Sequence, residues 1–413
     1  MLTYTIQPSG SLRGAVPIPG DKSISHRAII LASISEGKAV LTGFLRSADT
    51  LATLEACRQL GVSITLLDNE QVQIEGVGLH GLRAPSCVLD LGNSGTGFRL
   101  LTGLLAGQRF DSALTGDLSL QKRPMDRIFQ PLRLMGANID AQQFPVTIYG
   151  SSLRGISYES PIPSAQVKSC VLLAGLYATG KTVVTESVLT RDHTEQLLTG
   201  FYAARHEIFI PADISSAAFF IVGASIAPGS NILLENIGVN PTRLGMIHIL
   251  RRMGADITLE NERMFGMEPV ADIRVRYALL HGINIPAEYV VSAIDEFPII
   301  FIAAACARGS TCLTQAAELR VKESDRIQVM AAGLRKLGIR VEVLPDGMMI
   351  EGGQIQGGEI ESAGDHRVAM AFAMAGLVAR QTVIIHDCSN IGTSFPEFVT
   401  VAKQLGLDIG SNT

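Results

Sequence analysis

The segment LRLMGANI, residues 132–139, joins the end of a helix, a glycine and the start of a strand. The same pattern returns at residues 57–64, 250–257, 334–341 and 402–409. In each copy the glycine stands where a helix would end in a left-handed conformation, and an alternating segment typical of a strand follows. The chain therefore repeats one supersecondary unit, and each copy needs neighbours to cover its apolar face. The glycines are Gly61, Gly136, Gly254, Gly338 and Gly406.

The interval between the second and third copies is the longest, which predicts a sixth, degenerate copy. The candidate is LLTG at residues 197–200, with Gly200 at a helix end. A unit placed there is short by about one hairpin. We therefore expect residues to be missing between about Tyr202 and Ile208. Six strand and helix units in two lobes of three are the simplest arrangement.

Composition favours a compact α/β protein, with 413 residues, 47% hydrophobic and 18% charged. The net charge of -5 argues against a nucleic-acid partner. No apolar stretch reaches about 18 residues, and the N-terminal sequence MLTYTIQPSG is unlike a signal peptide, so we expect a cytoplasmic protein without a membrane partner. Cysteine and histidine spacings typical of zinc sites are lacking, so we expect no metal.

Two crossings between the lobes are expected, one near Gly20 and one at residues 238–242, where proline and asparagine interrupt the pattern. The first strand would then belong with the second half of the chain. These crossings give an N-terminal lobe of residues 20–239 and a C-terminal lobe of residues 1–19 plus 240–413.

The stretch PGDKSISHRAIILASI, residues 19–34, takes a turn directly into a helix. Asp21 or Ser23 can cap this helix, and Lys22 and Arg27 stand near its positive end. A helix N-terminus with added cations is an anion site. The alternative is an ordinary capped surface helix.

Four further segments carry polar or basic residues at helix starts. LGNSGTGFRLLTGLL, residues 91–105, is a glycine-rich turn whose amides could approach a ligand, although it fits neither a Walker A loop nor a dinucleotide fingerprint. QKRPMDR, residues 121–127, places three cations beside a proline. SAQVKS at 164–169 and RDHTE at 191–195 open two helices. The alternatives are a tight turn for residues 91–105, a solvated charge run for 121–127 and ordinary helix caps for the last two segments.

Charges also gather at later helix starts. ELRVKESDR, residues 318–326, precedes an apolar helix, and capping by Ser324 or Glu323 would leave its cations unexplained. DHR at 365–367 and the pair Asp295 and Glu296 precede two other apolar helices. Burial and neighbouring charges could tune the pKa values of these acids and bases.

Taken together and in this order, the motifs resemble those of the 5-enolpyruvylshikimate-3-phosphate (EPSP) synthases, or 3-phosphoshikimate 1-carboxyvinyltransferases. The resemblance extends over nearly the whole chain, and SAQVK and RDHTE resemble the variant group called class II. It implies an α/β fold, the two-lobed inside-out barrel of six βαβαββ units. The active site would lie in the cleft between the lobes.

The resemblance also implies the reaction. The enolpyruvyl group of phosphoenolpyruvate would pass to the 5-hydroxyl of shikimate 3-phosphate by addition and elimination, with release of phosphate, in the shikimate pathway to chorismate and the aromatic amino acids. It implies no metal or organic cofactor, and a monomer.

The family's site residues are carried over by motif. Asp295 would be the base on the 5-hydroxyl, Glu323 the proton donor to the phosphoenolpyruvate methylene, and Lys22 would assist proton transfer. The residues implied to bind shikimate 3-phosphate are Lys22, Ser23, Arg27, Ser164, Ala165, Gln166, Arg191, Asp295 and Lys322. Those implied to bind phosphoenolpyruvate are Lys22, Gly95, Arg123, Gln166, Arg326 and Arg367.

One position departs from many relatives, and two other functions stay open. Thr393 occupies a position where many relatives have lysine. The sister transferase that acts on UDP-N-acetylglucosamine usually has a cysteine five positions before the RP pair, whereas this chain has Leu118. A non-catalytic phosphosugar-binding protein would not need Asp295 and Glu323 together.

Overall fold

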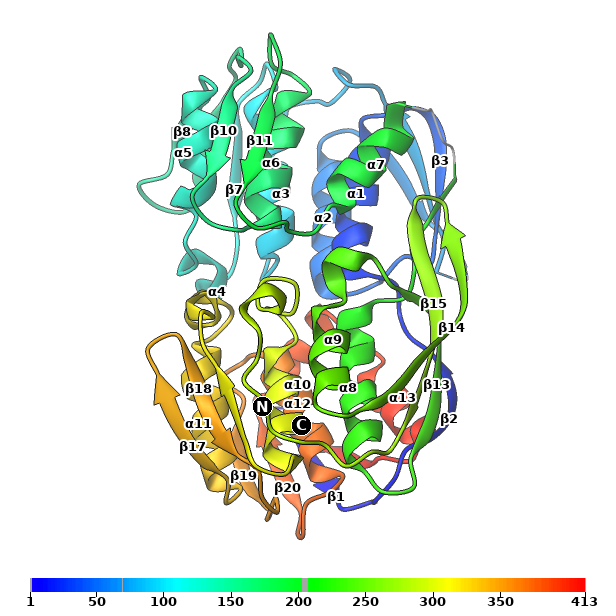
Figure 1. The fold of residues 1–413 in the computed structure, drawn as a ribbon. Coiled ribbons are helices and arrows are strands. Elements are labelled where there is room, and N and C mark those ends of the chain that lie inside the picture. Colours follow the sequence, from blue (N-terminus) through cyan, green and yellow to red (C-terminus); the bar gives the residue numbers. More distant parts are fainter. Residues whose placement is uncertain (1, 69, 203–206, 413) are drawn as a thin grey trace. The chain divides into compact units, whose positions relative to one another are not determined.

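The computed structural model describes residues 2–68, 70–202 and 207–412, and the chain divides into two compact units (Figure 1). Unit 1 comprises Met1–Pro19, Pro211–Met264 and Glu268–Thr413. Unit 2 comprises Gly20–Ile210 and the short segment Phe265–Met267. In the described residues each unit has three sheets, and no helix is both long and apolar enough to cross a membrane.

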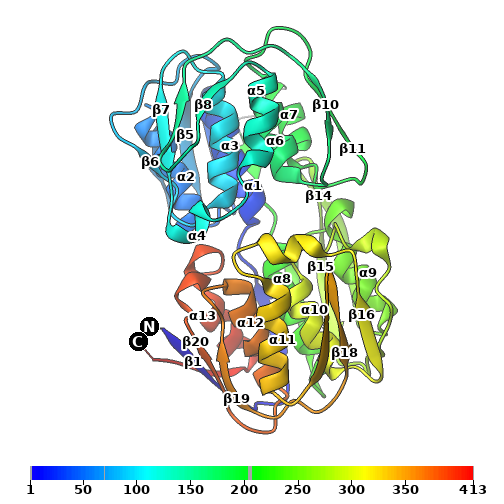
Figure 2. The same cartoon turned by 90° about the vertical axis from the view of Figure 1, so that its left-hand side faces the viewer.

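The helices of unit 2 are α1 (Lys22–Ser33), α2 (Ala48–Gln59), α3 (Gly95–Ala106), α4 (Leu118–Gln121), α5 (Asp126–Leu134), α6 (Ala165–Gly175) and α7 (His193–Tyr202). Its strands are β3 (Glu36–Thr42), β4 (Ser63–Leu66), β5 (Val72–Val77), β6 (Leu89–Asp90), β7 (Ser112–Thr115), β8 (Asn138–Asp140), β9 (Val146–Tyr149), β10 (Ser157–Ser160), β11 (Val183–Glu186) and β12 (Glu207–Phe209). The apolar helix α3 packs against α1, α2 and α6 (Figure 2).

The helices of unit 1 are α8 (Ile214–Ile226), η1 (Pro241–Arg243), α9 (Gly245–Arg252), η2 (Ala287–Tyr289), α10 (Phe297–Cys306), η3 (Ala317–Val321), α11 (Arg326–Lys336), α12 (His366–Gly376), η4 (Ser389–Thr393) and α13 (Phe398–Leu405). Its strands are β1 (Thr3–Gln7), β2 (Arg13–Pro17), β13 (Asn231–Gly238), β14 (Asp256–Phe265), β15 (Glu268–Arg276), β16 (Ser310–Leu313), β17 (Arg340–Leu344), β18 (Gly347–Glu351), β19 (Gly358–Glu361), β20 (Val383–His386) and β21 (Asp408–Asn412).

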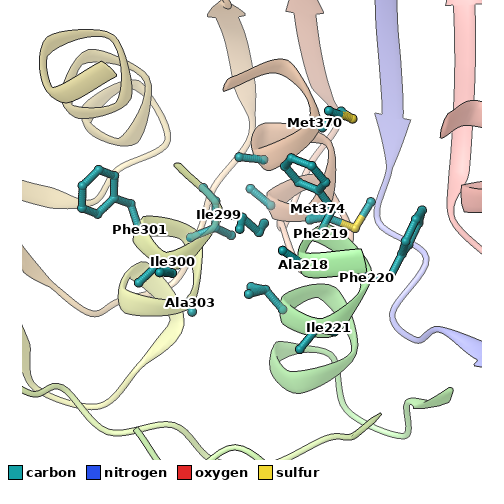
Figure 3. Packing of buried hydrophobic residues seen from close by; sticks show 14 of the residues in the cluster. Ala218, Phe219, Phe220, Ile221, Ile299, Ile300, Phe301, Ala303, Met370 and Met374 are labelled. Atoms are coloured by element: carbon teal, nitrogen blue, oxygen red, sulfur yellow. The ribbon is translucent and has the colours of Figure 1, made fainter. Parts of the chain in front are cut away.

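Three helices, α8, α10 and α12, form the centre of unit 1. Every residue of α8 is buried, and α10 is buried from Phe297 to Ala305, as expected for helices that are apolar on all sides. Phe219 and Phe220 of α8, Ile299 of α10 and Met374 of α12 belong to one buried cluster (Figure 3). Strands of the three sheets pack on these helices, with β13 and β15 on α8, β18 on α10 and β20 on α12.

The repeated glycines end their helices as the sequence predicts. All five have positive φ, between 84° at Gly338 and 105° at Gly406. The proposed sixth helix end at Gly200 is wrong, because α7 continues through this residue to Tyr202. The helical conformation of Gly200 leaves no left-handed cap at that point.

Most sheets combine a parallel strand pair with an antiparallel hairpin. The order β6-β7-β9-β8 shows the pattern, since β6 and β7 are parallel while β7, β9 and β8 are antiparallel. In the described residues, β10 and β11 form a parallel pair with no such hairpin. The expected gap between about Tyr202 and Ile208 falls on a segment of which residues 203–206 lie outside the described part of the structure.

The expected lobe boundary at residue 240 is wrong. Residues 211–239 belong to unit 1, because α8 fills its core and β13 pairs with both β2 and β15. The boundary at Gly20 coincides with the observed division. Strand β1 lies in unit 1, where it pairs with β20 and β21 from the other end of the sequence.

Candidate active site

The first turn of α1 presents a cation beside a capped helix end. Asp21 is the cap, because its Oδ1 accepts a hydrogen bond of 2.9 Å from the amide of Ile24. The hydroxyl of Ser23 is therefore not the cap. Lys22 forms an ion pair with Asp49 of α2. This pair holds the ammonium group near the positive end of α1.

Arg27 fixes α1 to two neighbouring helices. Its side chain is buried, and its Nε donates to Thr194 Oγ1 of α7 at 2.7 Å. Its Nη2 donates to Ser169 Oγ of α6 at 2.8 Å, and its Nη1 donates to the carbonyl oxygen of Ser23 at 2.9 Å. These bonds satisfy a cation that would be costly to bury alone. Arg191 lies two residues before the start of α7.

The N-termini of α3 and α6 come together in unit 2. Ser94 caps α3 by accepting from the amide of Gly97 at 3.0 Å. A Cβ atom on Gly95 would lie 2.9 Å from Arg123 Nη1, so the glycine lets the guanidinium reach the helix end. The Nε2 of Gln166 donates to Thr96 Oγ1 at 2.9 Å. Gly95, Arg123 and Gln166 are therefore neighbours.

The start of α6 also carries Ser164 and Ala165. Ser164 is the N-cap, as its Oγ accepts from the amide of Val167 at 3.4 Å. Further along α6, the buried Lys168 lies 2.8 Å from Glu186 Oε2 and 2.8 Å from Glu195 Oε1. Glu186 in turn accepts from the Thr190 hydroxyl at 2.6 Å. This ionic cluster holds the loop that carries Arg191.

In unit 1, charged side chains converge on Arg326 at the start of α11. Arg326 is 1% exposed. Its Nε donates to Asp365 Oδ2 at 2.8 Å, and its Nη2 donates to Glu323 Oε2 at 2.7 Å. Among the described residues its Nη1 has no hydrogen-bond partner, and it lies 3.8 Å from Asp295 Oδ1. A buried donor without an acceptor is costly, so this nitrogen suits an anionic ligand.

The remaining predicted residues of unit 1 lie around Asp295, next to the guanidinium group of Arg326. Lys322 Nζ lies 3.3 Å from Asp295 Oδ1. Arg367, in the first turn of α12, donates from Nη1 to the carbonyl oxygen of Asp295 at 3.0 Å. The set therefore combines three cations with carboxylates from separate helix starts.

Burial and neighbouring charges shift the pKa values of Arg326 and Asp365 in opposite directions. Burial alone would lower the pKa of Arg326, but the fields of Asp365, Glu323 and Asp295 hold that pKa above its usual range. Burial alone would raise the pKa of Asp365, yet Arg326 keeps it below 3.8. Both groups therefore stay ionised at neutral pH. In the described part of the chain, no cluster of three or more His, Cys, Asp or Glu side chains could hold a metal ion.

Comparison with known proteins identifies the family. The EPSP synthase (3-phosphoshikimate 1-carboxyvinyltransferase) family matches residues 6–402. A 3-phosphoshikimate 1-carboxyvinyltransferase of Methylococcus capsulatus is 55% identical, with 99% of this chain and 98% of the relative covered. The chain belongs to the EPSP synthase family.

The solved structures agree with this assignment. An EPSP synthase from Acinetobacter baumannii has a TM-score of 0.89 and 50% identity, with 100% of both chains covered. The enolpyruvyl transferase NikO from Streptomyces tendae has a TM-score of 0.80 at 14% identity, with 100% of this chain and 99% of that chain covered, which shows the fold alone. The predicted enolpyruvyl transferase fold is confirmed. The Methylococcus alignment spans 429 residues, more than this chain's 413, so the relative carries residues that this chain lacks.

The structure brings together several of the predicted site residues within each unit, but the sequence did not indicate several of their partners. The structural alternative for this segment was capping of α11 by Ser324 or Glu323, whereas the cap is Asp325, which accepts from the amide of Gln328 at 3.1 Å. Sequence reasoning also missed Arg99, although a charged residue in an otherwise apolar helix signals an internal partner. Lys168 in the largely apolar α6 carries the same signal, whereas Asp49 carries none. Thr393 is buried and donates its hydroxyl to the carbonyl oxygen of Asn390 at 2.7 Å.

His26 joins α1 to α2 and α3 and should make stability depend on pH. Its Nδ1 lies 2.8 Å from Thr53 Oγ1, and its Nε2 lies 3.4 Å from Ser94 Oγ. Desolvation holds the pKa of His26 well below 6.5, and Lys22 and Arg27 lower it further. Below pH 6.5 the unfolded chain binds a proton that the folded chain does not. The free energy of unfolding should fall by up to about 1.4 kcal/mol per pH unit.

Urea unfolding between about pH 7.5 and about pH 5.5 measures this slope. We expect His26→Gln to flatten the slope, because glutamine keeps a polar group at the position without titrating. His80→Gln, at an exposed position of unit 2, is the control and should leave the slope unchanged. Equal slopes for the parent chain and His26→Gln would contradict the expectation.

Proposed function

We propose that the chain transfers the enolpyruvyl group of phosphoenolpyruvate to the 5-hydroxyl of shikimate 3-phosphate and releases phosphate. The main support is full-length similarity, at 55% identity, to the 3-phosphoshikimate 1-carboxyvinyltransferase of Methylococcus capsulatus. The gathering of Asp295, Lys322, Glu323, Arg326 and Arg367 supports it independently. This step serves the shikimate pathway to chorismate and the aromatic amino acids.

Substrate binding is assigned to the cations and donors described above. Arg326 and Arg367 would take the anionic groups of phosphoenolpyruvate, because guanidinium groups bind carboxylates and phosphates through paired hydrogen bonds. Phosphoenolpyruvate is also assigned to Lys22, Gly95, Arg123 and Gln166. Shikimate 3-phosphate is assigned to Lys22, Ser23, Arg27, Ser164, Ala165, Gln166, Arg191, Asp295 and Lys322.

The chemistry needs one base and one acid. Asp295 would take the proton of the 5-hydroxyl as that oxygen attacks C2 of phosphoenolpyruvate, while Glu323 gives a proton to the methylene carbon C3. Loss of a proton from C3 and departure of phosphate from C2 would then restore the double bond. Lys22 would assist these proton transfers, and the cations would stabilise the charge on the phosphate that departs.

Three finer assignments belong to the same proposal. The chain would belong to the class II group, because SAQVK and RDHTE resemble the motifs of that group. The protein would act as a monomer in the cytoplasm, as the family resemblance implies. Its partners would be the two small-molecule substrates.

Phosphate release tests the proposed reaction. We expect release from phosphoenolpyruvate when shikimate 3-phosphate is present and none when the acceptor is omitted. UDP-N-acetylglucosamine is the parallel acceptor, and turnover with it but not with shikimate 3-phosphate would contradict the proposal. Leu118 begins α4 and is 74% exposed. It occupies the position where the sister transferases usually have cysteine, and a leucine side chain supplies no thiol.

A further inference from the structure

The side-chain amide of Gln166 is held at both ends. Arg99 Nη1 donates to Gln166 Oε1 at 2.5 Å, and Gln166 Nε2 donates to Thr96 Oγ1 at 2.9 Å. A guanidinium group carries only donors, so the amide oxygen must face Arg99. The opposite orientation would direct the amide N–H groups at those of the guanidinium. The nitrogen Nε2 carries two hydrogens, and Thr96 accepts one of them.

Arg99 also contacts the other two segments of this part of unit 2. It is 6% exposed and lies in the buried helix α3. Its Nη1 lies 3.4 Å from the carbonyl oxygen of Gly95, and its Nη2 lies 3.4 Å from that of Pro124, the residue after Arg123. One guanidinium group therefore reaches Gly95, the Arg123 segment and Gln166, which are the three neighbours described above.

Close packing leaves Arg99 little freedom. A Cβ atom on Gly95 would lie 3.0 Å from Arg99 Nη1, so the absence of a side chain at Gly95 makes room for the guanidinium. Ser94 caps α3, and a guanidinium group has no acceptor for the amides of a helix start, so capping does not explain Arg99. A cation in an apolar helix costs desolvation energy, which its hydrogen bonds must offset.

We propose that Arg99 is a positioning residue that fixes the amide of Gln166 so that it presents an N–H donor to the ligand. The inference rests on the proposed function, in which Gln166 contacts phosphoenolpyruvate and shikimate 3-phosphate. Both substrates carry anionic oxygens, which attract an N–H group and repel an amide oxygen. Arg99 thus acts on the substrates through Gln166.

A double-mutant cycle on kcat/KM for phosphoenolpyruvate tests this role. Arg99→Met should lower kcat/KM about 10- to 100-fold, the effect of losing a hydrogen bond to a charged group. In a Gln166→Ala background the same change should cost no more than about twofold, because the group it positions is absent. Arg99→Lys keeps the charge and one donor, and its loss should be intermediate.

Arg58→Met is the matched control. Arg58 lies near the end of α2 and donates to the carbonyl oxygen of Ile64 at 2.7 Å. It should leave kcat/KM within about twofold of the parent value, the limit of ordinary additivity. The urea midpoint of each variant shows whether a loss of activity comes from unfolding. If Arg99→Met does not fold, the double-mutant cycle is measured with Arg99→Lys instead.

Equal losses in the parent and Gln166→Ala backgrounds, or full activity of Arg99→Met, would overturn the assignment of Arg99. Absence of turnover in the parent protein would instead contradict the proposed function. In that case the cycle is measured on the Kd of phosphoenolpyruvate by calorimetry with shikimate 3-phosphate present. Additive effects on that Kd would again overturn the role of Arg99, and coupled effects would support it.

Discussion

Replacing Arg326 with methionine is expected to lower the free energy of unfolding by about 3–5 kcal/mol at neutral pH, as when one partner of a buried ion pair is removed. Arg326 lies against the carboxylates of Asp365, Glu323 and Asp295. Methionine fills much of the same space but carries no charge. Asp365 is fully buried, so its carboxylate would keep its desolvation cost without the compensating cation.

The loss of stability should depend on pH through Asp365. In the parent chain the pKa of Asp365 is lowered, so its stabilising contribution is present above 3.8 and is lost as the pH falls through the folded pKa. In Arg326→Met, burial would raise this pKa, and protonation would relieve the penalty. The difference in stability between the two proteins should therefore be largest near about pH 7 and shrink toward about pH 4.

Urea unfolding at both ends of this range measures the effect. Arg340→Met is the control in the same unit, since that side chain is 85% exposed and its pair with Glu351 should contribute little. Asp365→Asn added to Arg326→Met should recover part of the loss, because asparagine can still cap α12 without a charge. Equal stability of Arg326→Met and Arg340→Met would show that the buried charges do not support unit 1.

Glu323→Gln is expected to lower kcat about 10²- to 10⁴-fold, the usual contribution of a general acid. Glutamine has the same shape and can still accept a hydrogen bond from Arg326 Nη2, which lies 2.7 Å from Glu323 Oε2. The arrangement of cations should therefore survive, and both substrates should bind almost as before. Only the carboxyl proton that would be delivered to the methylene carbon is removed.

Single-turnover kinetics and calorimetric binding separate these two properties. Glu342→Gln, on the exposed face of β17, is the matched control and should leave kcat unchanged. An unchanged kcat for Glu323→Gln would remove this residue from the proton-transfer role. Equal losses of binding and turnover would indicate that Glu323 acts mainly by placing Arg326.

The fold was predictable where a local rule decides the conformation. LRLMGANI and its copies predict helix ends, and the five glycines adopt the left-handed conformation. The predicted helix end at Gly200 was wrong because a glycine without the rest of the pattern can stay inside a helix. The boundary at residue 240 failed for a different reason. The apolar run of α8 shows that the helix is buried, but it cannot show which core contains it.

The site was predictable to the extent that its residues carry motifs. Motif resemblance identified Lys322, Glu323 and Arg326, and the structure brings them together with Asp295. The partnership of Arg99 with Gln166 joins residues far apart in the sequence. No spacing rule connects such a pair, because the packing of α3 on α6 creates the contact.

The pairing of β1 with β20 and β21 also sets an order of events during synthesis. Residues 20–210 of unit 2 leave the ribosome as one continuous segment and can begin to fold while the rest of the chain is still being made. Unit 1 cannot be completed then, because Thr3 pairs with Asn412 near the last residue. Its final sheet must wait until β21 has been synthesised, and this contact of very long sequence separation should be the slow step.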